Sequence, residues 1–280
     1  MADKAHLQTD RRLARLEHQL KGLYTDAYKD IKKQISETVA KMEFTPDMTP
    51  QQRYVLATKY DRLTKLEAQI GDSLKHANQE AVRIVNNEMV NVYRINSEFM
   101  ANSIKEGIFP VLSKSEIKAI LTEQITPFKK LAIDTLKDSA EIKQALTREL
   151  TSAIMQGESI PQIAKRIRGT FESNLTRSVK IARTETTRVE NSARQDVAEQ
   201  ASKEGLPMKK KWVSTSDDRT RPAHNAADGQ VVDYNEPFIV DGEELMYPGD
   251  ESGSASNVIN CRCTMVSFVD KDALEKQKRK

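Results

Sequence analysis

Apolar residues recur at steps of three and four along much of the first 200 residues, which is the spacing that places side chains on one face of an α-helix. The first such stretch predicts a helix that ends near Met42. Its apolar face consists of Leu13, Leu16, Leu20, Leu23, Ala27, Ile31 and Ile35. Two prolines within Thr45–Pro50 remove backbone donors and favour an extended chain, so we expect a break there.

A second stretch, from Leu56 to Phe99, keeps an imperfect helical period without a proline. Its length exceeds that of most globular helices and favours coiled-coil-like packing against the first helix or a neighbouring subunit. We therefore expect an antiparallel helical hairpin.

Further helix signals follow Gly107–Pro110, which should end the second helix. Ser113 and Glu116 have the spacing of a capping box. The remaining sequence predicts a helix from Thr126-Pro127 to Met155, a short helix that starts at 156–161, and a helix from about Leu175 to Lys203 that stops at Gly205-Leu206-Pro207.

The pattern changes after Pro207. Short runs predict strands at 211–214, 230–232, 238–240 and 263–268, with Asp-Gly turns at 228–229 and 241–242. Only 10 glycines and 5% aromatic residues in 280 suit long amphipathic helices better than a large sheet. The sequence thus predicts an α+β fold, with a long helical N-terminal body and a small C-terminal mixed or antiparallel β domain.

A net charge of +3 does not by itself indicate a nucleic-acid-binding protein. The segment 228–260 carries eight acids and no Lys or Arg, and it would repel a phosphate backbone. Two segments are basic: the tail Lys276–Lys280 and the residues between 165 and 183. Their charges lie on a surface exposed to water or, alternatively, contact DNA. The N-terminus has no apolar leader, and no window approaches the roughly 18 apolar residues of a membrane span, so we expect synthesis in the cytosol.

The stretch from Lys211 to Val266 holds the single tryptophan, both cysteines and one of four histidines. Cys261, Cys263 and His224 are zinc-type ligands, and Asp217 or Asp218 would complete a tetrahedral set. On a strand, a Cys-x-Cys pair points both side chains to one face. A disulfide between them would close a small, strained ring, so we expect metal ligands or buried thiols that pack as small hydrophobic side chains.

Two catalytic alternatives use the same residues. One is a cysteine nucleophile with His224 as base and an Asp that orients it. The other is a hard metal held by Asp217, Asp218, Asp228 and His224 for nuclease or phosphatase chemistry. The competing explanation is that these carboxylates lie in turns and are exposed to water.

Glu185 and Arg188 share one helix face through their i, i+3 spacing. A buried pair would hold this helix against the β region, whereas a surface pair would contribute little to the stability of the fold. Trp212 is the expected hydrophobic anchor between helix and sheet.

The order of these short blocks resembles the phage Mu F-like family, the minor head or head morphogenesis proteins of tailed bacteriophages. The resemblance covers roughly Leu146 to Val266. Its blocks are Ala182-Arg183-Thr184-Glu185, Trp212-Val213-Ser214, Asp217 to His224, Asp228 to Val232, Phe238, Pro248-Gly249-Asp250 and Asn260-Cys261-Arg262-Cys263.

The resemblance implies a low-copy capsid protein that acts in procapsid assembly and associates with the portal vertex. The implied partners are the portal protein and a scaffold or major capsid protein, with no membrane; weak contact with DNA and exit from the head with it are further options. The implied location is the virion, in the head interior or at the portal vertex, after synthesis in the host bacterial cytoplasm. Because only Asp270 to Lys280 remain, we expect no additional toxin domain.

The resemblance assigns no catalytic role to its residues. We expect a metal site formed by His224, Cys261, Cys263 and Asp217, with zinc as the candidate ion. The residues expected to be structural are Arg183, Glu185, Trp212, Arg219, Arg221, Asp228 and Asn260. The alternative function is a metal-dependent hydrolase or nuclease, or an effector carried in the phage head.

The expected organisation has four parts. Residues 1–110 form a helical arm, and residues 111–205 form a helical bundle that leads into the Mu F-like domain. Residues 206–270 form the β-rich part of that domain, and residues 271–280 form a basic tail.

Overall fold

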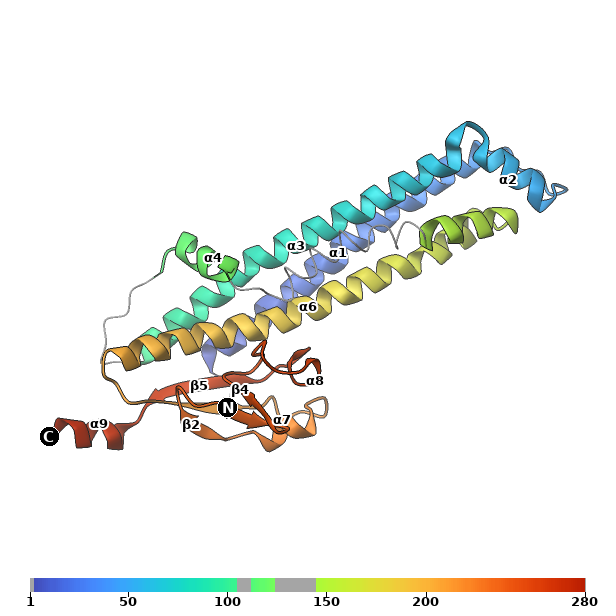
Figure 1. The fold of residues 1–280 in the computed structure, drawn as a ribbon. Helices are drawn as coiled ribbons and strands as arrows, with labels where there is room; N and C mark the ends of the chain where they lie inside the picture. Colours follow the sequence, from blue (N-terminus) through green and yellow to red (C-terminus); the bar gives the residue numbers. More distant parts are fainter. Residues whose placement is uncertain (1–2, 105–111, 124–144, 280) are drawn as a thin grey trace. The chain divides into compact units, whose positions relative to one another are not determined.

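The computed structural model describes residues 3–104, 112–123 and 145–279 (Figure 1). Long helices dominate the described chain, and its strands lie after Pro207, so the predicted α+β fold is confirmed. None of the described helices is both long and apolar enough to cross a membrane.

The described helices are α1 (Lys4–Ala40), α2 (Pro50–Thr58), the short 3-10 helix η1 (Lys59–Asp61), α3 (Arg62–Ser103), α4 (Lys114–Glu123), a helical segment at residues 145–155, α6 (Ile160–Lys203), α7 (Pro222–Ala226), α8 (Ala255–Val258) and α9 (Lys271–Lys278). The described strands are β1 (Met208–Val213), β2 (Val231–Asp233), β3 (Phe238–Val240), β4 (Glu243–Leu245) and β5 (Thr264–Val269).

The chain forms two compact units. The first contains the described parts of 1–16, 85–127 and 180–280, and the second contains those of 17–84 and 128–179. The long helices α1, α3 and α6 each contribute to both units, whereas all the strands named above belong to the first.

The second unit is helical, and its core joins three helices. The hydroxyl of Tyr24 on α1 donates to Oδ1 of Asn78 on α3 at 2.6 Å and lies 2.8 Å from Oγ of Ser178 on α6. The i, i+3, i+4 spacing of apolar residues places them on one face of each helix. The fully buried apolar residues of this unit include Leu20, Ile31, Ile35, Leu66, Ile70 and Ile167.

The two N-terminal helices run antiparallel, as predicted. Tyr24 on α1 meets Asn78 on α3 in the second unit, whereas the earlier residue Arg12 pairs with the later residue Glu88 in the first, at 2.6 Å. A later residue of α1 thus pairs with an earlier residue of α3, which is the pattern of a helical hairpin.

Two predicted helix boundaries are wrong. The helix expected from 56 to 99 is interrupted at η1, where Asp61 has a φ of 55°. Asp adopts this left-handed conformation more readily than most residues because its short polar side chain bonds locally. The two helices expected between 156 and 203 are instead the single helix α6 of 44 residues. An interior glycine such as Gly169 costs a helix only about 1 kcal/mol, which burial of Ile167 and Phe171 offsets.

The predicted helix ends are better reproduced. Ser113 and Glu116 form the capping box that opens α4, with bonds of 2.7 Å and 3.3 Å between each side chain and the other residue's backbone nitrogen. After α6, the backbone nitrogens of Gly205 and Leu206 donate to Ser202 and Ala201, which is the predicted C-cap. The helix expected to begin at Thr126 falls outside the described residues up to residue 144, and residues 145–155 are helical.

The first unit contains an antiparallel three-stranded sheet of order β2-β1-β5 and a separate β3-β4 hairpin. Trp212 lies opposite Met265 in the β1–β5 register. The hairpin turns at the predicted Asp241-Gly242, where both residues have positive φ. β3 lies where it was predicted, β1 starts three residues earlier than expected, and β4 was missed because two of its three residues are Glu.

The apolar core of this part of the first unit contains Trp212, Ala227, Phe238, Val240, Leu245, Cys261, Cys263 and Met265. The predicted strand 263–268 begins one residue later, at Thr264, so neither cysteine lies in a strand. The basic tail contains the helix α9, whose N-cap is Asp270; the pattern of charges alone did not predict it.

Candidate metal centre

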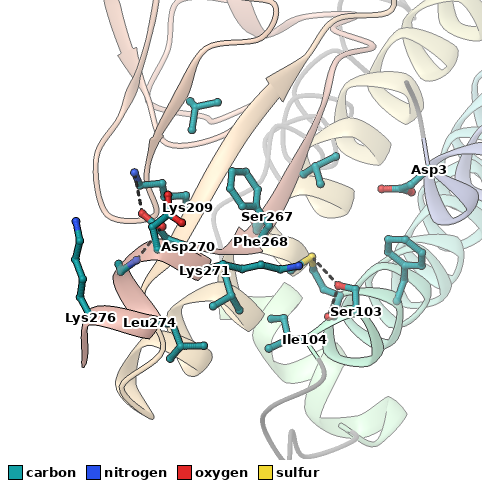
Figure 2. A pocket seen from close by; sticks show the side chains of 17 residues that line it. Asp3, Ser103, Ile104, Lys209, Ser267, Phe268, Asp270, Lys271, Leu274 and Lys276 are labelled. Carbon is teal, nitrogen blue, oxygen red and sulfur yellow. Dashed lines mark hydrogen bonds and ion pairs between the residues drawn. The ribbon is translucent and has the colours of Figure 1, made fainter. Parts of the chain in front are cut away.

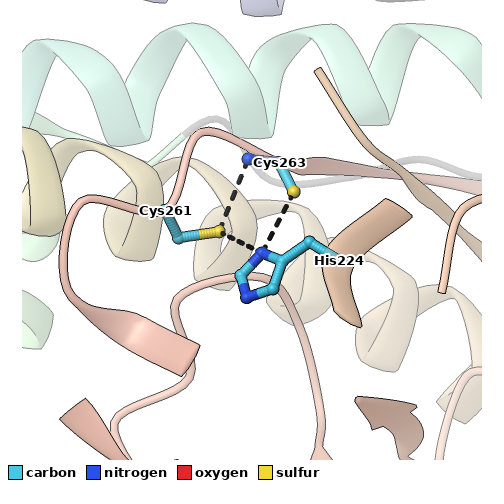
Figure 3. Close-up of side chains that lie close together, drawn as sticks. All are labelled: His224, Cys261 and Cys263. Carbon is cyan, nitrogen blue, oxygen red and sulfur yellow. Dashed lines mark hydrogen bonds between the residues drawn. The ribbon is translucent and has the colours of Figure 1, made fainter. Parts of the chain in front are cut away.

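Three donor atoms converge in the first unit, from α7 and from the loop before β5 (Figure 3). Nδ1 of His224 lies 3.6 Å from Sγ of Cys261 and 3.4 Å from Sγ of Cys263. Each of these residues is at most 2% exposed. Within the described ranges they are the one set of three or more His, Cys, Asp or Glu residues whose ligand atoms come this close together.

The cysteine loop is shaped by a turn at Asn260. This residue has a φ of 57°, a left-handed conformation that Asn tolerates. Its backbone nitrogen donates to Oγ1 of Thr184 at 3.0 Å. Arg221, which directly precedes α7, donates to the carbonyl oxygen of Ile259. These bonds tie the start of the loop to α6 and to the helix that carries His224.

Side chains of α6 hold the remainder of the loop. Thr187 donates to the carbonyl oxygen of Cys261 at 2.5 Å. Asn191 donates to the carbonyl oxygen of Cys263 at 3.3 Å and accepts from the backbone nitrogen of Met265 at 2.8 Å. The cysteine carbonyls are therefore bonded to a helix and not to a neighbouring strand. This pairing explains why the strand predicted to begin at Cys263 begins after it.

The two sulfurs are surrounded by hydrogen-bond donors. The backbone nitrogen of Cys263 lies 3.4 Å from Sγ of Cys261, and that of Thr215 donates to Cys263. The bond from Cys261, together with the hydrogen bond and charge of His224, lowers the pKa of Cys263 to about 5 against the opposing effect of burial. The same bond, with burial, raises the pKa of Cys261 well above its usual value. The two thiols thus differ in acidity, with the lower pKa at Cys263.

Asp217 does not join these donors. Its two carboxylate oxygens accept from the guanidinium of Arg262, each at 2.6 Å, and this bond holds the pKa of Asp217 well below its usual range. Arg219 lies 3.6 Å from the same carboxylate and is largely exposed. Asp228 accepts from the backbone nitrogen of Ser214 at 2.7 Å. The structure thus gives Asp217 and Asp228 hydrogen bonds within loops, apart from His224 and the cysteines.

Trp212 and the Glu185–Arg188 pair are buried. The indole ring packs edge-on against His224 and Phe238, with centroids 5.8 and 5.3 Å apart. Nη2 of Arg188 lies 3.1 Å from Oε2 of Glu185, and both side chains are 2% exposed. Burial raises the pKa of Glu185, while the charge of Arg188 opposes the shift. Arg183 is half-buried on the same helix.

Sequence reasoning missed a polar stripe on α6. Thr184, Thr187, Asn191 and Arg194 follow one another at steps of three and four, which is helical spacing. All four are buried. Arg194 continues the contacts of the other three by donating to the carbonyl oxygen of Met265 at 2.8 Å. The spacing was visible in the sequence, but a polar stripe at this spacing normally faces solvent.

The N-terminal end of α1 joins the same region of the first unit through Glu190. Oε1 of Glu190 lies 2.8 Å from Nδ1 of His6 and 3.2 Å from Nη2 of Arg194. The same oxygen accepts from Thr264 at 2.8 Å. Arg194 also bonds Asp3 and Asn96. One buried network therefore links α1, α3, α6 and β5.

A separate groove of about 1170 Å³ lies in the first unit, where the end of α3, β5 and α9 meet (Figure 2). Its lining is mainly apolar, with Phe99, Ile104 and Phe268 among its residues. Lys209 and Asp270 form an ion pair of 3.0 Å in its wall. None of the three convergent donors lines it.

Residues 144–266 match the family of Phage Mu protein F like proteins. Three relatives overlap the chain to different extents. The minor head protein GP7 of Bacillus phage SPP1 is 26% identical over 268 residues, which cover 93% of this chain and 84% of that protein. The NAD(+)–arginine ADP-ribosyltransferase EFV of Enterococcus faecalis is 34% identical over 142 residues, and the uncharacterized protein YqbB of Bacillus subtilis is 29% identical over 164.

The coverage of these relatives differs. The match with the enterococcal enzyme spans 51% of this chain but only 29% of that enzyme. The match with YqbB spans about half of each of the two chains. No solved structure matches the chain. The family match contains α6, α7, the cysteine loop and nearly all of the β region. Residues 144–266 of the chain are therefore similar to the family of Phage Mu protein F like proteins, and the other residues lie outside that match.

Proposed function

We propose that this chain is a minor head protein of a tailed bacteriophage and acts in assembly of the phage head. The observation that carries the proposal is the similarity to minor head protein GP7, which extends along 93% of the chain. That similarity includes the N-terminal helices, which lie outside the family match. A shared domain alone would not account for an overlap of this length.

The helical arm is the part that we expect to bind a portal or scaffold protein. On α2, in the second unit, Tyr54 is 39% and Val55 is 55% exposed. Exposed large apolar side chains contribute to many protein–protein contact sites. The polar network around Glu190 and Arg194 would keep the family domain rigid while the arm engages its partner.

Contact with DNA plays at most a secondary role in this proposal. The segment 228–260 carries eight acids and no Lys or Arg, so this part of the domain repels phosphate. Lys276 and Lys278 lie on the exposed helix α9, where a weak DNA contact would form. Placement in the head interior or at the portal vertex, and exit with the DNA, belong to the same proposal.

The hydrolase or nuclease alternative has less support. A phosphodiester substrate needs access to the catalytic groups, and His224, Cys261 and Cys263 are each at most 2% exposed. The carboxylate of Asp217 is bonded to Arg262. The name of the enterococcal relative describes a transferase of which this chain covers 29%. Its activity therefore gives no support for the same activity here.

Deletion of the gene from the phage that encodes this chain tests the proposal. We expect fewer infectious particles and defective heads, with recovery when the wild-type chain is supplied from a plasmid. Val55→Asp should weaken that recovery without unfolding the chain, because Val55 is exposed. Gln51→Asp, at another exposed position of α2, is the matched control. Normal heads and normal infectivity after deletion would contradict the proposal.

A further inference from the structure

The group formed by His224, Cys261 and Cys263 brings together one imidazole nitrogen and two sulfurs, which are donor atoms that zinc prefers in proteins. Nδ1 of His224 lies within 3.6 Å of both sulfurs, so the three donor atoms are close enough to share one ion. We propose that these three atoms bind one soft divalent metal ion, zinc in the cell, and that this ion fixes the cysteine loop against α7.

The distances fit a tetrahedral zinc ion. With Zn–S of about 2.3 Å and Zn–N of about 2.0 Å, the nitrogen–sulfur edge of a tetrahedron is about 3.5 Å. The two nitrogen–sulfur distances are 3.6 and 3.4 Å. All three ligand atoms lie within 4.8 Å of one another, which is the spacing of side chains that share one ion.

The type of donor selects the metal. Two cysteine sulfurs and an imidazole favour zinc and other soft or borderline ions, whereas calcium and magnesium prefer oxygen ligands. The carboxylate next to this loop, that of Asp217, is held by Arg262. Within the described ranges the donor set is therefore two sulfurs and one nitrogen.

The surroundings of the sulfurs suit thiolate ligands. Backbone N–H groups of Cys263 and Thr215 point at Cys261 and Cys263, respectively. Such bonds orient a ligand and stabilise its charge, as outer contacts do in known metal sites. Thr187 and Asn191 fix the carbonyl groups of the two cysteines from α6. The loop is thus held on one side by α6. A bound metal ion would hold it on the other side by joining it to His224.

Burial indicates a structural ion. Catalytic zinc sites keep an open position for substrate, but each of the three ligand residues here is at most 2% exposed. The ion would stabilise the family domain in place of a larger apolar core. This inference does not depend on the proposed role in head assembly.

Elemental analysis of the full chain, purified in reducing buffer without chelator, tests the inference. We expect about one zinc ion per chain, as in structural zinc sites. Cobalt(II) supplied after zinc removal should give the charge-transfer absorption of a cobalt–thiolate bond and the intense visible bands of a tetrahedral ion. This spectrum uses the wild-type chain, so it remains informative if substituted chains fail to fold.

Substitutions assign the ligands. Cys261→Ser, Cys263→Ser and His224→Ala should each lower zinc affinity by about tenfold or more. Asp217→Asn and His76→Ala are the controls: the first removes the nearby carboxylate, and the second removes an exposed histidine of the second unit. Both should keep zinc and the cobalt spectrum.

Amide exchange supplies a readout of the structural role. Removal of zinc from the wild-type chain should speed exchange at Thr215 and Cys263, while the amides around Tyr24 in the second unit stay protected. A folded, reduced wild-type chain that takes up neither zinc nor cobalt would overturn the inference. Retention of zinc by all three ligand variants would overturn it as well.

Discussion

The side-chain amide of Asn191 on α6 accepts a hydrogen bond from the backbone nitrogen of Met265 on β5 at 2.8 Å. The same side chain donates to the carbonyl oxygen of Cys263 at 3.3 Å. One buried amide thus holds the end of the cysteine loop and the start of a strand against the helix. The structure of the family domain depends on such long-range polar bonds as well as on its small apolar core.

Replacement of Asn191 by Leu should destabilise the first unit by about 2 to 4 kcal/mol, because two buried backbone groups lose their partner. Trp212, the single tryptophan, is fully buried in this unit, so its fluorescence in urea measures the change. Gln200→Leu, an exposed change on the same helix, should leave the midpoint nearly unaltered. An equal midpoint for Asn191→Leu and wild type would show that the bond adds nothing.

The buried Glu185–Arg188 pair gives a second test. Arg188→Met should cost about 3 to 5 kcal/mol, because it leaves the Glu185 carboxylate buried without its nearby charge. The double change Glu185→Leu with Arg188→Met should recover much of that loss. Urea unfolding followed by Trp212 fluorescence distinguishes the variants. A double variant no more stable than the single one would contradict this account of the pair.

The exposed pair Lys203–Glu199 on the same helix serves as the control for that experiment. Surface ion pairs contribute little because water and salt screen them. Lys203→Met should therefore leave the unfolding midpoint unchanged.

Gly249 lies directly against α6. A Cβ atom at this position would come within 3.1 Å of the backbone nitrogen of Arg188, and Gly249 has a φ of 84°. Gly249→Ala should therefore combine the cost of a left-handed conformation, about 1 to 2 kcal/mol, with a steric cost. Gly242 has a φ of 77° but open space around it, so Gly242→Ala should show the first cost alone. If both variants lose the same amount of unfolding free energy, a steric clash with α6 is excluded.

The His6–Glu190 contact makes stability depend on pH. Burial lowers the pKa of His6, but the hydrogen bond and charge of Glu190, with a smaller contribution from Asp10, outweigh burial and raise it overall. Arg194 opposes the rise. Because the pKa is higher in the folded chain than in the unfolded chain, the stabilisation is complete below about pH 6.5 and is lost as pH rises through the folded value.

We therefore expect the urea midpoint of the first unit to fall between about pH 6 and about pH 9 by more in wild type than in His6→Gln. His18→Gln, at an exposed position of α1, should keep the wild-type dependence. Parallel pH profiles for wild type and His6→Gln would rule out this contribution.

Much of the helical fold was predictable because its signals are local. The face of α1, the capping box of Ser113 and the turn at Asp241-Gly242 each involve residues within a few positions of one another. The interruption at Asp61 and the continuity of α6 through Gly169 were not predictable, because both depend on packing that a local pattern does not specify.

The grouping of the three candidate ligands was predictable from composition and not from a local pattern. The sequence contains few cysteines and histidines, so grouping His224 with Cys261 and Cys263 needed little information. The partner of Asp217 lies 45 positions away at Arg262, and the partners of Asn191 lie more than 70 positions away. Contacts over such separations follow from tertiary structure, and no spacing rule identifies them.

Quantitative mass spectrometry of purified phage particles tests the central claim most directly. Copies of this chain are counted relative to the portal protein, in full particles and in particles emptied of DNA. We expect a few copies in each full particle, and loss on emptying would add that the chain leaves with the DNA. Absence of the chain from full particles that infect normally would contradict its assignment as a minor head protein.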